Sequence, residues 1–273
     1  MQKRLFFLLL FSYAAAAGYS QVQISGKVVQ SSGEAIPYVN IGIKNKNTGT
    51  VSGETGAFSI QLKPENLTDT LTFSCIGYEE LHLPVQQIIS EKRNLFYLNP
   101  KITELKEVVL GNKLRKRKTI GTKSVNPLFW GSATSKDGTD IIEMCKRFDL
   151  KSSAAIEKLH VYLKGVTTPS VTFRIHFYEV KDDMPGERLT EQLILYKKDI
   201  DNGWLEMDLT SLDLVFDDDF FVSIEFLPLQ PAKGYSFSYG GQVGGGLYTR
   251  ESSLGTWKKS SGATISMYLT VTQ

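Results

Sequence analysis

Residues 54–62 read ETGAFSIQL, a short turn followed by six residues that alternate in polarity. Phe58 and Ile60 face one side of an extended chain, because successive side chains of a β-strand point in opposite directions. Thr55 and Gly56 supply the turn that leads into the strand. This stretch therefore predicts a half-buried strand that is entered through a tight turn.

Similar strands are predicted on both sides of this stretch. Alternating or apolar runs occupy residues 24–30, 39–43, 71–75 and 95–98, and turn residues separate them. Short strands at this spacing, roughly one every 8–12 residues, are typical of an all-β sandwich. We therefore expect residues 22–100 to form one all-β domain.

Four ordered motifs in this region resemble the carboxypeptidase-regulatory-like domain, a transthyretin-like sandwich that is frequent in exported proteins of the Bacteroidetes. The motifs are Ile24-x-Gly26-x-Val28, Ile36-Pro37-x-Val39-x-Ile41, Thr55-Gly56-x-Phe58-x-Ile60 and Phe73-Ser74-x-Ile76-Gly77-Tyr78. The resemblance implies a seven-strand sandwich over residues 22–100.

Residues 105–110 also resemble the segment that follows this domain in the family, where it often leads to the plug of a TonB-dependent outer-membrane receptor. Only about 160 residues remain after it here. That length is far too short for a transporter barrel of about 22 strands, so a receptor function is not implied.

The first 20 residues predict a secretory signal peptide. Lys3 and Arg4 precede an apolar run from Leu5 to Phe11, and small residues follow. Cleavage after Ala17 and cleavage after Ser20 both fit. The apolar run is shorter than the ~20 residues that cross a bilayer, and no later segment is apolar enough, so we expect no transmembrane segment in the mature chain. Export would place the protein in the periplasm, at the outer membrane or on the cell surface.

Residues 140–273 predict a second strand-rich domain. Val171, Phe173, Ile175 and Phe177 alternate with polar residues, and about eight such strands are expected. This number suits a jelly-roll-like sandwich, and the region loosely resembles galactose-binding-like domains. Residues 101–139 are predicted to be a linker. Its basic run is a solvated segment or a contact for anionic envelope polymers: Lys113, Arg115, Lys116, Arg117 and Lys118.

Charge and cysteine content limit the possible functions. Lys and Arg number 31 against 29 Asp and Glu, a formal net charge of +2. This balance provides no general attraction to nucleic acid. Cys75 and Cys145 fall in different predicted domains, and two buried free thiols are favoured over a disulfide.

The sequence assembles no convincing catalytic motif. His176 and Glu179 match the H-x-x-E of zinc carboxypeptidases, but an offset of three residues in a strand sends them to opposite faces. No histidine follows His176 to complete a zinc site, and alternation predicts it to be a surface residue. We expect neither enzymatic activity nor a cofactor. The remaining alternative is a hydrolase whose site is assembled in space around His82, His160 or His176.

Two regions are candidates for binding. The acidic run Asp217, Asp218 and Asp219 is expected to be a solvated turn, with a calcium site as the alternative. A glycine-rich region contains further candidates for stacking on sugars, with core packing favoured instead: Tyr235, Tyr239, Tyr248, Arg250 and Trp257.

The sequence therefore predicts two β-sandwich domains joined by a basic linker in an exported, non-catalytic protein of the cell envelope. Binding or scaffolding is the expected role. The expected partners are an envelope protein or a glycan, but not nucleic acid. The alternative function is that of a carbohydrate-binding module in glycan capture.

Overall fold

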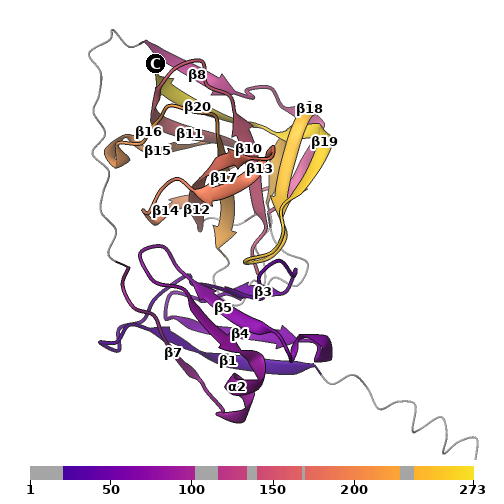
Figure 1. Cartoon of the computed structure of the whole chain (residues 1–273). Coiled ribbons are helices and arrows are strands. Elements are labelled where there is room, and N and C mark those ends of the chain that lie inside the picture. Colours follow the sequence, from indigo (N-terminus) through magenta and orange to yellow (C-terminus); the bar gives the residue numbers. More distant parts are fainter. Residues whose placement is uncertain (1–20, 102–115, 134–139, 168–169, 228–236) are drawn as a thin grey trace, which may run out of the picture.

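The computed structural model describes residues 21–101, 116–133, 140–167, 170–227 and 237–273. These residues form two β-domains, a smaller one from the N-terminal part of the chain and a larger one from the rest (Figure 1). The predicted signal peptide lies outside the described residues. No helix in the described ranges combines the length and the hydropathy needed to cross a bilayer.

The first domain is a sandwich of two sheets. The three-stranded sheet has the order β4 (Ala57–Leu62), β1 (Val22–Val29), β7 (Leu95–Tyr97). The four-stranded sheet has the order β3 (Gly49–Val51), β2 (Asn40–Gly42), β5 (Thr70–Ser74), β6 (Leu81–Pro84). The short helices η1 (Pro64–Asn66) and α2 (Val85–Ser90) flank β5 and β6 in the chain. The predicted seven-strand sandwich is confirmed.

Three phenylalanines lie at the centre of this sandwich. Phe58 contacts Phe73 and Phe96 edge-to-face, with ring centroids 5.6 and 5.3 Å apart, and Phe73 stacks on Phe96 at 4.6 Å. The rings belong to β4, β5 and β7, so they join the two sheets. Such aromatic pairs contribute to stability beyond their buried area. Phe58 of the alternating stretch at 57–62 therefore lies at the centre of the core that holds the sandwich together.

The second domain contains thirteen strands in one branched sheet. They are β8 (Arg117–Gly121), β9 (Asn126–Ser132), β10 (Glu143–Phe148), β11 (Ala154–Lys164), β12 (Ser170–Lys181), β13 (Met184–Arg188), β14 (Ile194–Asp199), β15 (Gly203–Asp208), β16 (Val215–Phe216), β17 (Phe220–Leu227), β18 (Ser238–Arg250), β19 (Lys258–Ile265) and β20 (Met267–Thr272). A 3-10 turn, η2 (Thr210–Leu212), precedes β16.

The sheet folds into two layers around one apolar core. The junction layer contains β12, β17 and β10, with β13 and β14 paired to β12. The outer layer contains β15, β11, β20 and β8. Side chains such as Phe173 and Ile224 from the junction layer meet Val161 and Leu269 from the outer layer in the same core cluster. The second domain is therefore also a sandwich, with more strands than the eight predicted.

Strand β18 connects the two layers. Its first residues pair with β11 and β9, and its last residues pair with β10. Gly244 and Gly245 have φ of +96° and +78°, and the register with β19 shifts between Val243 and Gly246. A bulge of this kind bends a strand, and glycine adopts positive φ without steric cost. The glycine-rich region is thus a bent strand and not a loop.

The predicted linker is wrong for its described part, residues 116–133. Strand β8 pairs with β20, and β9 pairs with β18, so both belong to the second domain. Most of their side chains are exposed. Edge strands with little buried surface show almost no apolar alternation, which is why the sequence suggested a linker.

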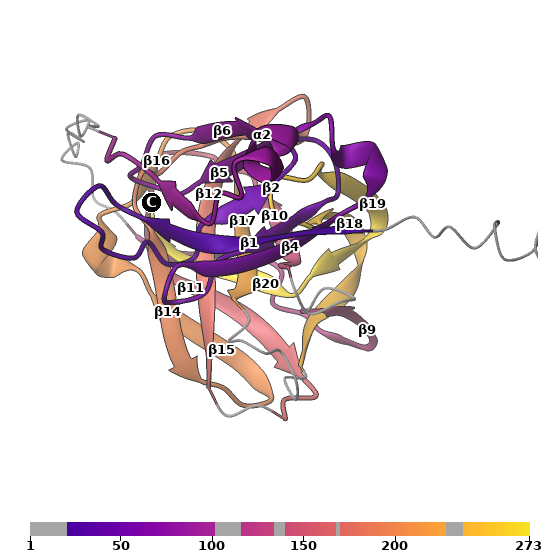
Figure 2. The same ribbon diagram turned by 90° about the horizontal axis from the view of Figure 1, so that it is seen from below.

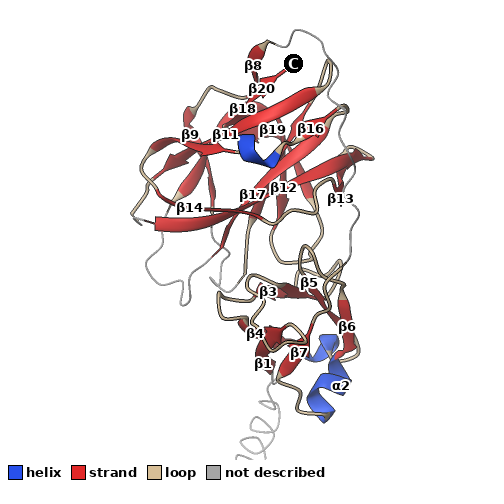
Figure 3. Ribbon diagram, turned by 90° about the vertical axis from the view of Figure 1, so that its left-hand side faces the viewer, coloured by secondary structure: helices blue, strands red, loops and turns tan. Residues whose placement is uncertain are grey.

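The two domains are in direct contact, with the β2–β3 side of the first domain against the junction layer (Figure 3). In the view from below, the first domain lies in front of the second (Figure 2). Tyr38 and Val51 pack with Ile141 and Leu227 of the second domain in one small cluster. A Cβ atom at Gly49 would lie 2.5 Å from the carbonyl oxygen of Ser253. The backbones therefore approach so closely that only glycine fits there.

Candidate functional site

A row of four charged side chains crosses the junction layer on the face turned toward the first domain. Arg174 of β12 pairs in register with Glu225 of β17, Glu225 with Glu143 of β10, and Glu143 with Arg250 of β18. Both carboxylates and Arg174 are buried. Cross-strand partners lie about 5 Å apart, so the row forms two ion pairs side by side, Arg174–Glu225 and Arg250–Glu143.

The row is linked by hydrogen bonds to both domains. The Arg174 guanidinium also donates to the carbonyl oxygen of Tyr38 and to Oδ1 of Asn40, at 2.6 Å each. Glu143 accepts from Tyr178 Oη at 2.7 Å and from the Ser223 hydroxyl. Burial alone would raise the pKa of Glu143 and Glu225, but Arg250 and Arg174 outweigh it and lower both values. The carboxylates are therefore ionised, and the row stabilises the domain contact.

His176 belongs to this buried region, so the prediction of a surface residue is wrong. Its Nε2 lies 3.0 Å from Oε1 of Glu225, and burial lowers its pKa. Alternation correctly placed it on the polar face of β12, but the first domain covers part of that face. Glu179 lies outside this buried region and lines a cavity.

The other two histidines also have hydroxyl partners. His82 Nδ1 lies 3.1 Å from Thr72 Oγ1, and His160 Nε2 lies 3.0 Å from Thr270 Oγ1. His160 Nδ1 is 3.8 Å from a carboxylate oxygen of Glu206. The hydrolase alternative therefore remains open on these distances.

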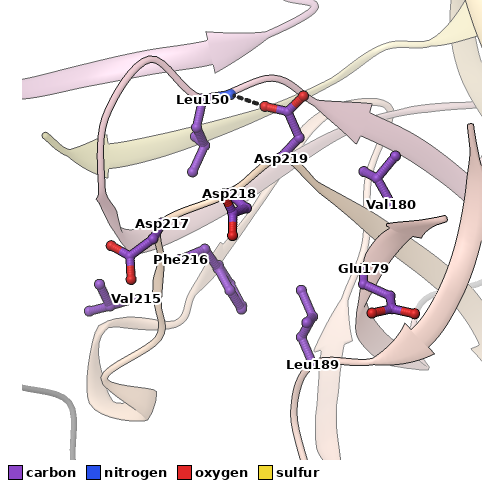
Figure 4. Close-up of a pocket in the computed structure, with 9 residues that line it drawn as sticks. All are labelled: Leu150, Glu179, Val180, Leu189, Val215, Phe216, Asp217, Asp218 and Asp219. Atoms are coloured by element: carbon purple, nitrogen blue, oxygen red, sulfur yellow. Dashed lines mark hydrogen bonds between the residues drawn. The ribbon is translucent and has the colours of Figure 1, made fainter.

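A cavity of about 870 Å³ opens between the β16–β17 turn and β12 (Figure 4). Its lining mixes carboxylates and apolar side chains: Leu150, Glu179, Val180, Leu189, Val215, Phe216, Asp217, Asp218 and Asp219. Asp219 accepts from the Leu150 amide at 2.8 Å and from Arg147 at 2.7 Å. In the described part of the chain no group of three or more His, Cys, Asp or Glu side chains is placed to hold a metal. The calcium alternative gains no support from this turn.

The aromatic candidates of the glycine-rich region do not form one surface. Tyr239 is only 1% exposed and packs in the core between the layers, whereas Tyr248 packs with Cys145 on the junction layer. Arg250 is bound to Glu143 and lies 4.7 Å from the ring centroid of Trp257. Tyr239 and Tyr248 are thus packed in buried clusters, as the favoured expectation of core packing has it, and the alternative of a shared sugar platform gains no support because the two rings lie in different clusters. Tyr235 lies outside the described residues.

A different aromatic surface lies on the outer layer. We name it the outer aromatic face and define it by Trp130, Tyr162, Trp204 and Tyr268. The centroid of Trp204 lies 5.4 Å from that of Tyr162 and 4.9 Å from that of Tyr268, both edge-to-face. Trp130 is 58% exposed and Trp204 is 38% exposed. Three of the rings are thus packed against one another, and both tryptophans are open to solvent.

Basic and histidine side chains hold these rings in place. Lys123 Nζ lies 5.0 Å from the centroid of Tyr268, and Lys164 Nζ lies 4.8 Å from that of Trp130. The His160 ring stacks on Tyr268 with centroids 4.1 Å apart. Burial lowers the pKa of His160, so this ring is neutral near pH 7.

Sequence reasoning missed most of this face. Trp130 lies in the predicted linker, and no pattern in the sequence singles out Trp204. The signal that the sequence does contain is the alternation of Leu159, Val161 and Leu163 with His160 and Tyr162, which puts the latter two on the other face of β11. The cysteines were predicted correctly: Cys75 and Cys145 are buried and free.

Comparison with known proteins identifies the first domain. Residues 24–110 match the family model of the CarboxypepD_reg-like domain, so this part of the chain is a carboxypeptidase-regulatory-like domain. The "TonB-dependent receptor P39" of Formosa agariphila is 32% identical over 103 residues, which make up 38% of this chain and 9% of that receptor. The chain thus spans less than a tenth of this relative's length.

Solved structures give weaker likenesses. The cysteine protease and lectin-like domains of Cwp84, a surface layer associated protein of Clostridium difficile, align with a TM-score of 0.37 at 9% identity, over 95% of this chain and 59% of theirs. The T13 IBDV viral particle aligns with a TM-score of 0.28 at 10% identity, over 93% and 62%. Both scores are too low to identify a shared fold.

Proposed function

We propose that the protein is a non-catalytic binding protein of the cell envelope, in which the regulatory-like domain is fixed to a larger sandwich that carries the binding surface. The outer aromatic face is the observation that carries this proposal. Exposed apolar groups that gather on one surface and are rimmed by polar side chains often mark interaction sites. The partial match to a TonB-dependent receptor and the predicted signal peptide favour an envelope location.

The absence of catalysis is supported by the surroundings of the histidines. Thr72 and Thr270 lie within antiparallel ladders, β5–β6 and β11–β20. Acyl transfer needs backbone or side-chain donors aimed at the developing oxyanion, and amides in a ladder are used by the neighbouring strand. The buried His176 is enclosed between the domains, where a substrate cannot reach it.

Two measurements test this function. When the tagged full-length chain is expressed in its own organism, it should be found in the envelope fraction and lack its first residues. Recovery of unprocessed protein from the cytosol would contradict the proposal. Purified residues 21–273 should show no turnover on peptide, ester and glycoside substrates. Turnover that is lost in His160→Ala or His82→Ala would replace binding with the hydrolase alternative.

A further inference from the structure

We propose that the outer aromatic face binds an extended, uncharged saccharide chain. This inference rests on the proposed binding function and names its ligand class.

Strand register places the rings in a row. Trp130 of β9 is paired with Gly240 of β18, and Tyr162 of β11 is paired with Trp204 of β15. The ladder between β11 and β18, in which Leu163 faces Tyr239, brings Tyr162 next to Gly240. Four neighbouring strands at about 4.8 Å spacing span roughly 14 Å. The row is therefore long enough to contact several sugar units.

Gly240 makes the row continuous. A Cβ atom at this position would lie 2.6 Å from Cδ1 of Tyr162, so the Tyr162 ring lies over the bare backbone between the two tryptophans. The edge-to-face contacts and the cations on Trp130 and Tyr268 fix the remaining rings. Rings that are already fixed lose little conformational entropy on binding.

The side chains around the rings suit a saccharide better than a protein. Outward positions from Lys158 to Lys164 on β11, and those of β15 and β20, carry only aromatic, charged or hydroxyl groups. A sugar ring presents C–H groups on its faces, which pack on aromatic rings, and hydroxyl groups on its edges, which need donors and acceptors. Exposed aliphatic side chains, which protein interfaces use in their cores, are absent from these described positions.

The charges of the face argue for a neutral chain. Lys158 is paired with Glu206, and the lysines at 123 and 164 lie against the rings. Asp208 adds one carboxylate to the same face. Neither positive nor negative charge predominates strongly on this face, so its side chains do not select for a polyanion or a polycation.

Exposed aliphatic side chains outside the row provide the competing explanation. Leu128 of β9 is 81% exposed and Val243 of β18 is 57% exposed. A protein partner that extends beyond the row would cover Leu128, whereas a saccharide on the row would not need it. The substitution Leu128→Ser therefore separates the two classes of ligand.

The experiment uses residues 21–273 on an array of neutral and acidic polysaccharides, with affinity electrophoresis and tryptophan fluorescence on each polymer that binds. We expect at least one neutral polysaccharide to bind, and Trp130→Ala and Trp204→Ala each to weaken binding about tenfold or more, as removal of a central aromatic contact does. Gly240→Val should weaken it as well, because it displaces Tyr162. Trp257→Phe, on the junction layer, is the matched control and should bind like the unmodified protein.

Three results would overturn the inference: no neutral polymer binds, only acidic polymers bind, or binding persists in the double variant Trp130→Ala/Trp204→Ala. Circular dichroism of each variant shows whether it is folded. A purified envelope protein that binds through Leu128 and not through Trp204 would refute the saccharide but keep the proposed binding function. A cytosolic location would refute the proposed function itself.

Discussion

Replacing Arg174 with methionine tests the idea that one buried side chain holds both the junction layer and the domain contact together. Arg174 neutralises Glu225 and donates to Tyr38 and Asn40 of the first domain. Methionine fills a similar volume but provides no donor. The variant thus leaves a buried carboxylate without its cation, removes the Arg174 donor from the Tyr38 carbonyl, and leaves Asn40 Oδ1 with the longer bond from the Ser253 hydroxyl, at 3.4 Å.

The expected loss of unfolding free energy follows from these three contacts. Removing one partner of a buried ion pair costs about 3–5 kcal/mol, because the other charge stays buried. Each hydrogen bond from a charged donor contributes about 1.5–3 kcal/mol, and two of them cross between the domains. We expect the second domain to lose about 3–5 kcal/mol of unfolding free energy and its coupling to the first domain to weaken.

Urea unfolding can separate these two effects, because all three tryptophans, Trp130, Trp204 and Trp257, lie in the second domain. Tryptophan fluorescence therefore follows that domain, and far-UV circular dichroism follows both. The unmodified protein should give coincident transitions, and Arg174→Met should give an earlier fluorescence transition that is separate from the rest. In Arg174→Met/Glu225→Gln, second-domain stability should largely return, whereas the two transitions should stay separate.

Two outcomes would refute the reasoning. One is an Arg174→Met variant within about 1 kcal/mol of the unmodified protein, a range typical of exposed ion pairs. The other is a double variant no more stable than the single one, since the cost would then not come from the unpaired carboxylate. Arg174→Lys keeps the positive charge but loses the guanidinium geometry. As a control, its unfolding free energy should lie between those of the unmodified protein and Arg174→Met.

Further predictions concern Lys146, the domain contact at Gly49 and the two cysteines. Burial lowers the pKa of Lys146 to about 8, so the folded state binds fewer protons than the unfolded chain and its stability rises between about pH 8 and pH 10.5. In urea unfolding, Lys146→Met should be about 2–3 kcal/mol more stable than the unmodified protein at pH 7 and no more stable above pH 10.5. Equal gains in stability at both pH values would contradict this. Gly49→Val should separate the domains, because its side chain would collide with Ser253, and small-angle scattering should then show a longer particle; an unchanged radius of gyration would count against the close approach. Cys75 and Cys145 should react with a thiol reagent only in denaturant, where two thiols per chain should be found, and fewer would indicate a disulfide.

The first domain could be predicted from sequence because the alternation of apolar and polar residues is visible within its strands. Phe58 and Ile60 alternate with Ser59 and Gln61, and the structure buries the first pair and leaves the second pair at least partly exposed. Strand β4 has one face in the core and one at least partly exposed, which is the situation that alternation describes. The family motifs then fix the order of the strands.

The junction layer could be predicted only in part. The pattern in β12 correctly gives a strand with Phe173 and Ile175 on one face and Arg174 and His176 on the other. It does not say that a second domain covers the polar face. Burial of that face depends on contacts with residues more than 130 positions away, such as Tyr38, and local periodicity contains no information about them.

The outer aromatic face was missed for a related reason. Trp130 and Trp204 lie 74 positions apart, on strands whose own alternation is short or weak. They become neighbours in one row only through the register of β9, β18, β11 and β15. The sequence instead drew attention to Tyr239 and Tyr248, which are close to glycines but face buried clusters.

The two polar faces of the second domain have different physical roles, and the core between them keeps these roles apart. The face of the junction layer carries charges that would be costly to bury without partners, and the first domain helps to supply those partners. The face of the outer layer carries rings that tolerate water on one side, so it needs no covering domain to be stable. A ligand can therefore bind the outer aromatic face without disturbing the contact between domains. For this reason we regard the regulatory-like domain as a fixed base for the second sandwich and the outer layer as the surface that meets the partner.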